Sequence, residues 1–323
     1  MQRRYTVSTQ IICWCYEVVA RRLARMTPRD TGLAALMALI WGSNFVVIEW
    51  GLQDVPPLLF AAMRFVLVLL PAIFLVPRPA VSWRVLATVG LTVSLGQFSM
   101  LYLALHLGMP SGMAALVLQV QVPLTIVIAA VVLHERVAPA VAIGVGVAVV
   151  GLAVVALGRG AAGLLPFAVT LLAGLSWAVG NVVVRAKGVP GGLGLTVWSS
   201  LVVPLPLLAL SLLVDGPATV VDALSGLGWR PLLSTAWTAV VSTLVGYGIF
   251  YSLLHRNPSA TVVSWVLAVP PLAILLAWVL QGDQPSAIDL VGAGIAMTGL
   301  AAAQLLQARA RRAPVLPEVV PAR

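Results

Sequence analysis

Residues 139–158 read PAVAIGVGVAVVGLAVVALG, and none of these side chains is charged or carries an amide or hydroxyl group. An α-helix rises about 1.5 Å per residue, so this run would be about 30 Å long, the thickness of the hydrocarbon core of a bilayer. Gly144 and Gly151 are about two helical turns apart and therefore share one face. The stretch predicts a transmembrane helix that packs closely against another helix through its glycines.

Nine further apolar runs of similar length lie around this one, separated by short breaks rich in proline, glycine and charge. The chain is 61% hydrophobic and 9% charged, whereas soluble domains carry about 25% charged residues. A soluble protein needs polar groups to cover its surface, so this apolar excess must face lipid. Membrane-barrel strands are excluded because they are only about 10 residues long and alternate in polarity. The predicted spans are 31–50, 58–77, 84–106, 111–133, 139–158, 163–184, 195–214, 231–254, 259–281 and 287–306.

The glycine pattern of residues 139–158 recurs 148 residues later in the chain. A looser match, with a shorter offset, joins the first and sixth spans. The pairs at the longer offset are Pro123 and Pro271, Gly144 and Gly292, Gly146 and Gly294, and Gly151 and Gly299; the looser match aligns Trp41, Asn44 and Gly51 with Trp177, Asn181 and Gly188.

This repeat divides the chain into two halves of five spans, residues 31–158 and 163–306, with tails at 1–30 and 307–323. Because each half has an odd number of spans, the second half would insert upside down relative to the first. The expected fold is an all-α integral membrane protein with two inverted five-helix repeats. In secondary transporters of this design, the substrate site lies near the midplane between the repeats. The alternative is that membrane helices merely share a composition.

The net charge of +9 could indicate a nucleic-acid-binding protein, but the basic residues lie in short loops and tails. With ten spans, 16 of the 19 Lys and Arg residues fall on the side of the termini and two on the other side. Loops rich in Lys and Arg stay in the cytoplasm, so both tails are predicted to be cytoplasmic. No nucleic-acid partner is expected.

The N-terminal residues differ from the rest of the chain. Cys13 and Cys15 are poorly spaced for a disulfide framework and lack the partners of a zinc site, so we interpret them as incidental. No clear signal peptide is visible. Translation could start at Met1 or at Met26.

Proline in the middle of a span frees a backbone carbonyl, which must then face the protein interior or a wet cavity. Pro123 and Pro271 are such residues, and Gln119 and Gln121 flank the first of them. The glutamine amides could bind a polar solute, or they could form hydrogen bonds between helices at a structural kink.

Asn44 and Asn181 each follow a tryptophan by about one turn and should point into the bundle, because a polar side chain facing lipid is costly. Each could bind solute or bridge two helices. Further candidates for the same cavity are Gln97, Tyr102, Tyr247 and Trp265.

Arg64 lies inside a predicted span, which makes it a candidate functional residue. It stands about seven residues into its span, within reach of the membrane interface. Two interpretations stay open: a structural ion pair with Glu49, or binding of a carboxylate on the substrate.

Several stretches resemble the EamA-type branch of the drug/metabolite transporter superfamily over about residues 27–306. They are Gly32-Leu-Ala-Ala-Leu, Ile40-Trp-Gly-Ser-Asn44-Phe, Pro56-Pro, Arg64-Phe and Leu133-His-Glu135-Arg136. Further similarity to members that export amino-acid metabolites lies in Pro71-Ala-Ile-Phe, Gly108-Met-Pro110, Leu116-Val-Leu-Gln119 and Val245-Gly-Tyr-Gly248-Ile.

The resemblance implies a multi-pass protein of the bacterial inner membrane that exports small amino-acid metabolites. The scarcity of charge within the spans favours neutral or zwitterionic solutes over multiply charged ones, and the resemblance implies solutes such as O-acetylserine or cysteine. Two departures stand out. Glu49 replaces a lysine of such exporters, and Asp283-Gln284 replaces the Glu-Arg pair in the second half, which puts an ion pair of that loop in doubt.

A membrane-embedded enzyme or assembly factor acting on lipid-linked substrates is the alternative function. It would need a charged or histidine cluster at one membrane face, and the sequence shows no catalytic, metal-ligand or phosphate-loop pattern. We therefore expect no enzyme activity and no cofactor. The expected partners are a small-molecule solute and the lipid bilayer, in a monomer or a homodimer.

Overall fold

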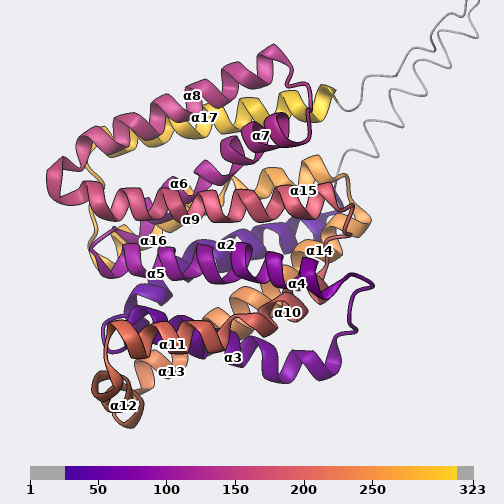
Figure 1. Ribbon diagram of the computed structural model, residues 1–323. Coiled ribbons are helices and arrows are strands. Elements are labelled where there is room, and N and C mark those ends of the chain that lie inside the picture. Colours follow the sequence, from indigo (N-terminus) through magenta and orange to yellow (C-terminus); the bar gives the residue numbers. More distant parts are fainter. Residues whose placement is uncertain (1–25, 311–323) are drawn as a thin grey trace, which may run out of the picture.

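The computed structural model describes residues 26–310, and this part of the chain is entirely helical (Figure 1). Cys13 and Cys15 lie outside the described residues. Helices of the first half are α2 (Pro28–Gly51), α3 (Pro57–Leu75), α4 (Trp83–Val89), η1 (Gly90–Gly96), α5 (Gln97–His106), α6 (Ser111–Val117), η2 (Leu118–Val120), α7 (Gln121–Val132) and α8 (Pro139–Gly158). Those of the second half are α9 (Gly160–Ala186), α10 (Leu193–Ser199), η3 (Ser200–Val202), α11 (Pro204–Val214), α12 (Pro217–Ser225), α13 (Trp229–Ala236), η4 (Trp237–Val245), α14 (Gly246–Arg256), α15 (Ser259–Val266), α16 (Val269–Gln281) and α17 (Ala287–Ala310).

Over the described residues, nine helices are long and apolar enough to cross a membrane, and a tenth span is formed if the bent pair α10–η3 and α11 counts as one. These two segments meet at an angle of 42°. Large apolar side chains cover the outside of the bundle; Phe74, for example, is 84% exposed. The protein is an all-helical, multi-pass membrane protein, as predicted. The short helix α12, between two spans, was not predicted.

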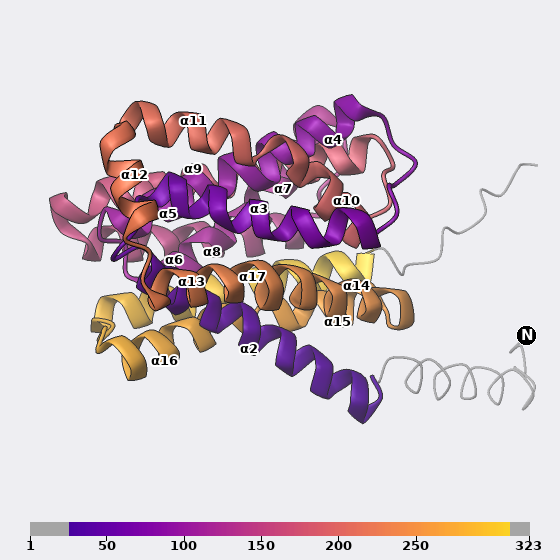
Figure 2. The ribbon, with the colours of Figure 1, turned by 90° about the horizontal axis from the view of Figure 1, so that it is seen from below.

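Several helices begin at a proline, which lacks the N–H that would be unpaired in a first turn. At the start of α2, the Thr27 hydroxyl also accepts a hydrogen bond from the Asp30 N–H at 3.1 Å. Figure 2 shows that the described ends of the chain, at α2 and α17, lie at the same end of the bundle. We call this the terminal end.

The last helices of the two halves, α8 and α17, lie side by side (Figure 1). A Cβ added to Gly151 would lie 2.2 Å from the Ala296 nitrogen, and one added to Gly299 would lie 2.3 Å from the Ala148 nitrogen. The repeat relates these two contacts to each other. Adding 148 to Gly151 gives Gly299, and adding 148 to Ala148 gives Ala296. The sequence repeat is therefore a two-fold relation in space, with the helices antiparallel.

The third span of each half contains a π-helical segment. These segments are η1 and η4, and they lie at matching positions of the repeat. π-Helical turns often occur at functional sites. Neither segment was predicted from the sequence.

A side chain from the other half bonds to a carbonyl of each π segment. The Trp41 indole, in α2, donates to the Ser242 carbonyl at 3.1 Å, and the Ser176 hydroxyl, in α9, donates to the Thr92 carbonyl at 2.8 Å. A glycine follows each acceptor by four residues and leaves room for the donor. A Cβ added to Gly246 would lie 2.6 Å from Trp41 Nε1, and one added to Gly96 would lie 2.2 Å from Ser176 Oγ. We call these two hydrogen bonds the cross-repeat contacts.

The fourth span of each half is also interrupted at a matching place. The 3₁₀ segment η2 precedes Pro123, and a turn at residues 267–268 precedes Pro271. The mid-span breaks expected from these prolines are present, and both begin before the proline itself.

Candidate functional site

Arg64 lies in the interior of the bundle and is 2% exposed. Its side chain stays inside the bundle and does not extend to the surface of the protein. Its Nη1 donates to the Tyr102 hydroxyl at 3.0 Å, and its Nη2 donates to the Thr243 hydroxyl at 2.9 Å. The guanidinium carbon lies 3.8 Å from the centre of the Phe98 ring. Helices α3, α5 and η4, from both halves, together hold this cation.

Of the two interpretations of Arg64, the ion pair with Glu49 is wrong. Glu49 lies instead beside Ser111 and Gln281, with Asp283 near enough for its charge to act on Glu49. Within residues 26–310, no carboxylate is paired with Arg64, and its Nε atom is buried without a hydrogen-bond partner.

The reason for this error is the face of α2 on which Glu49 lies. Glu49 follows Gly42 by seven residues and so shares its face. Gly42 packs against Leu272 and Ala273 of α16. Glu49 is therefore turned toward α6 and α16, away from Arg64.

Two of the predicted site residues belong to the surroundings of Arg64. Tyr102 is fully buried, and its ring lies 5.4 Å from that of Phe60. Tyr247 lies within range of the Arg64 charge, and its ring lies 5.1 Å from that of Trp41. Thr243 and Phe98, which contact Arg64 directly, were not predicted, because nothing local in the sequence distinguishes them from other membrane-helix residues.

Three further predicted residues are buried amides with an unpartnered polar atom. Asn44 and Gln97 are 7% and 1% exposed, and each has an unpartnered side-chain oxygen. Gln119 is 5% exposed, and its Nε2 has no partner, although its oxygen accepts a hydrogen bond from Gln121 Nε2 at 3.3 Å. A buried polar atom without a partner costs free energy, so these atoms are suited to bind a polar guest.

Asn181 and Trp265 lie in other surroundings. The Asn181 oxygen accepts a hydrogen bond from the Trp177 indole at 3.2 Å within α9, so the match to Asn44 in sequence is not a match in contacts. Trp265 packs in a small apolar cluster with Phe250 and Leu253.

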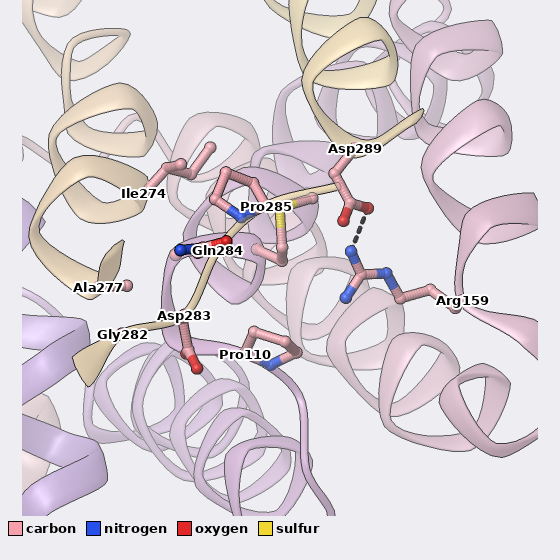
Figure 3. Close-up of a pocket in the computed structure, with 11 residues that line it drawn as sticks. Pro110, Arg159, Ile274, Ala277, Gly282, Asp283, Gln284, Pro285 and Asp289 are labelled. Atoms are coloured by element: carbon pink, nitrogen blue, oxygen red, sulfur yellow. Dashed lines mark ion pairs between the residues drawn. The ribbon is translucent and has the colours of Figure 1, made fainter. Parts of the chain in front are cut away.

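A pocket of about 190 Å³ opens at the end of the bundle opposite to the terminal end (Figure 3). In this pocket, Asp289 at the start of α17 forms an ion pair with Arg159, which lies in the connection between α8 and α9. Burial raises the pKa of the Asp283 carboxyl in the same pocket, so it keeps its proton to a higher pH than an exposed aspartate does. Among the described residues Asp283 forms no ion pair, and the pair beside it joins Arg159 to Asp289 of α17.

Comparison with known proteins agrees with this architecture. The EamA-like transporter family matches residues 31–157 and 164–303. Probable amino-acid metabolite efflux pumps of Escherichia coli and Salmonella typhimurium are 38% and 39% identical over 282 residues, which cover 85% of this chain and 94% of each relative. A crystal structure of a protein with 22% identity aligns with a TM-score of 0.60 over 89% of this chain and 99% of that one.

The family match covers most of both halves, and it agrees with the duplicated helices and the buried polar interior. It also excludes the enzyme alternative. The chain belongs to the EamA-like transporter family.

Proposed function

We propose that this protein exports small amino-acid metabolites from the cytoplasm across the bacterial inner membrane by alternating access. The observation that carries the proposal is the buried Arg64, held between the two halves by neutral hydroxyl groups. An intramembrane cation without a protein carboxylate is suited to a solute that brings its own. The names of the two relatives above support the same class of solute.

Residues that would line the solute path are buried or half-buried, and they are polar or aromatic. The unpartnered oxygens of Asn44 and Gln97 can accept hydrogen bonds from a solute ammonium group. Together with the Arg64 cation, they would suit a zwitterion. The proposed set is Asn44, Arg64, Gln97, Tyr102, Gln119, Gln121, Asn181, Tyr247 and Trp265.

Membrane orientation follows from the basic residues. Tails 1–30 and 307–323 would lie in the cytoplasm. The pocket around Asp283 and Asp289 would then open on the periplasmic side.

A flux measurement tests this proposal. Inverted membrane vesicles containing the protein should accumulate radiolabelled O-acetylserine or cysteine above the level of empty vesicles. Absence of such uptake across a panel of amino acids would contradict the proposal.

Asn44→Ala and Gln119→Ala are each expected to lower this flux about tenfold, because each removes a buried group that can bind the solute, at about 1 to 2 kcal/mol per hydrogen bond. Gly146→Ala is the matched control, because a Cβ there meets nothing within 4 Å. The amount of folded protein, measured by size-exclusion chromatography, should be the same in all three. Unchanged flux in both amide variants would remove them from the site.

A further inference from the structure

We propose that Arg64 is the receptor for the solute carboxylate, so that a free carboxylate is required for transport. This inference rests on the proposed export function and names the chemical group by which a solute is selected. Three observations carry it: the unused donors of Arg64, the contrast with the other arginines, and the rigid frame around it.

The guanidinium has more donors than its surroundings use. Arginine carries five N–H groups, of which two bond to Tyr102 and Thr243. Nε has no partner. Three N–H groups therefore remain, one on each Nη and one on Nε, and arginine binds a carboxylate in bidentate fashion through two neighbouring N–H donors.

Three other arginines in the described part of the chain have carboxylate partners. Arg159 pairs with Asp289, Arg185 with Glu135 at 2.7 Å, and Arg256 with Asp30 at 3.1 Å. These pairs lie at the ends of the bundle, where ion pairs join helices and loops. Arg64 is more deeply buried than any of these three arginines, yet its partners are two hydroxyl groups and the rings of Phe65 and Phe98.

The groups around Arg64 hold it in one orientation. The Thr243 hydroxyl donates to the Thr238 carbonyl at 2.7 Å across the π-helical segment, which leaves its oxygen lone pair for Arg64. Tyr102 is fixed by the neighbouring ring of Phe98, 6.2 Å away. A guanidinium held in this way binds a carboxylate with little loss of side-chain entropy.

A carboxylate on the unused donors would add charged hydrogen bonds to the two that Arg64 donates to the neutral hydroxyls. Hydrogen bonds between two ionised groups are shorter and about twice as strong as neutral ones. In the low-dielectric interior of a membrane protein, the charge of the solute would compensate that of Arg64. A solute with an amide in place of the carboxylate cannot do this and would leave the cation uncompensated.

Competition on the unaltered protein tests this proposal first. Uptake of radiolabelled cysteine into inverted vesicles is measured against unlabelled cysteine and against cysteinamide, which differ only at the carboxyl group. Cysteinamide is expected to compete at least 30-fold more weakly. Equal competition would overturn the proposal while leaving the export function intact, whereas absence of uptake for cysteine, O-acetylserine and the rest of the amino-acid panel would contradict the export function itself.

Variants of Arg64 provide the second arm. Arg64→Gln should reduce cysteine flux at least 30-fold, and Arg64→Lys should retain more flux than Arg64→Gln, because it keeps the charge but loses the bidentate geometry. Arg78→Gln, in an exposed loop, is the control and should transport normally. Cysteine flux in a folded Arg64→Gln variant equal to that of the control would overturn the proposal; if the variant does not fold, the competition experiment still decides.

Discussion

Alanine at Gly151 or at Gly299 is expected to destabilise the protein by about 2 kcal/mol or more, although it adds only one methyl group. That methyl would lie 2.2 Å from the Ala296 nitrogen in the first case and 2.3 Å from the Ala148 nitrogen in the second. These obstacles are backbone atoms of the facing helix, so α8 and α17 must move apart to accept the methyl. Overpacking of this kind costs about 1 to 3 kcal/mol.

Gly146→Ala and Gly294→Ala are matched controls on the same two helices. A Cβ at either position meets nothing within 4 Å, so the free energy of unfolding should change by less than about 0.5 kcal/mol. The measurement is thermal unfolding of the detergent-solubilised protein, followed by the loss of the monodisperse peak. Equal unfolding temperatures for all four variants would show that α8 and α17 do not pack in this way.

Arg159→Met is expected to cost about 3 kcal/mol, because it leaves the carboxylate of Asp289 buried without its cation. Asp289 is 5% exposed, and its remaining partners are the Ser286 hydroxyl at 2.8 Å and the Ser286 N–H at 3.1 Å. The pair connects the segment between the halves to the start of α17, so its loss loosens the junction of the two repeats.

A double-mutant cycle separates the ion pair from its parts. Arg159→Met combined with Asp289→Asn should cost less than the sum of the single changes, because the neutral amide no longer needs the cation. Arg185→Met is the control at an exposed pair, whose side chains are 38% and 34% exposed, and it should cost at most about 1 kcal/mol. A strictly additive cycle would contradict a stabilising Arg159–Asp289 contact.

The spans could be predicted from the sequence because hydropathy and length alone decide what crosses a bilayer. Even Pro71 and Pro166 left their helices unbroken, as the lengths of α3 and α9 show. The glycines on α8 and α17 also predicted that each packs closely against another helix, because glycines at regular spacing clear one helix face of side chains and let a second backbone approach it. That these two helices contact each other was not predicted. Helix α12 was not predicted because a short amphipathic helix has a much weaker hydrophobic pattern than the strongly apolar spans on either side of it.

The site was less predictable, because it depends on which faces of distant helices meet. Arg64 was recognised as an intramembrane charge, but its partner depended on the rotation of α2, which turns Glu49 toward α16. Thr243 became a partner through the π-helical segment η4, and π turns have no strong sequence signature. Asn181 matched Asn44 in its spacing from a tryptophan, yet the Asn181 side-chain oxygen already accepts a hydrogen bond from the Trp177 indole.

The cross-repeat contacts of Trp41 and Ser176 bear on how the two halves could move. In inverted-repeat transporters, alternating access is largely a rocking or gating of one repeat against the other around the fixed substrate site. Each cross-repeat contact joins a helix of one half to the π-helical segment of the other. If the hydrogen bonds to the Ser242 and Thr92 carbonyls are kept during this motion, the two repeats rotate about these contacts, and the helix ends far from them move the most.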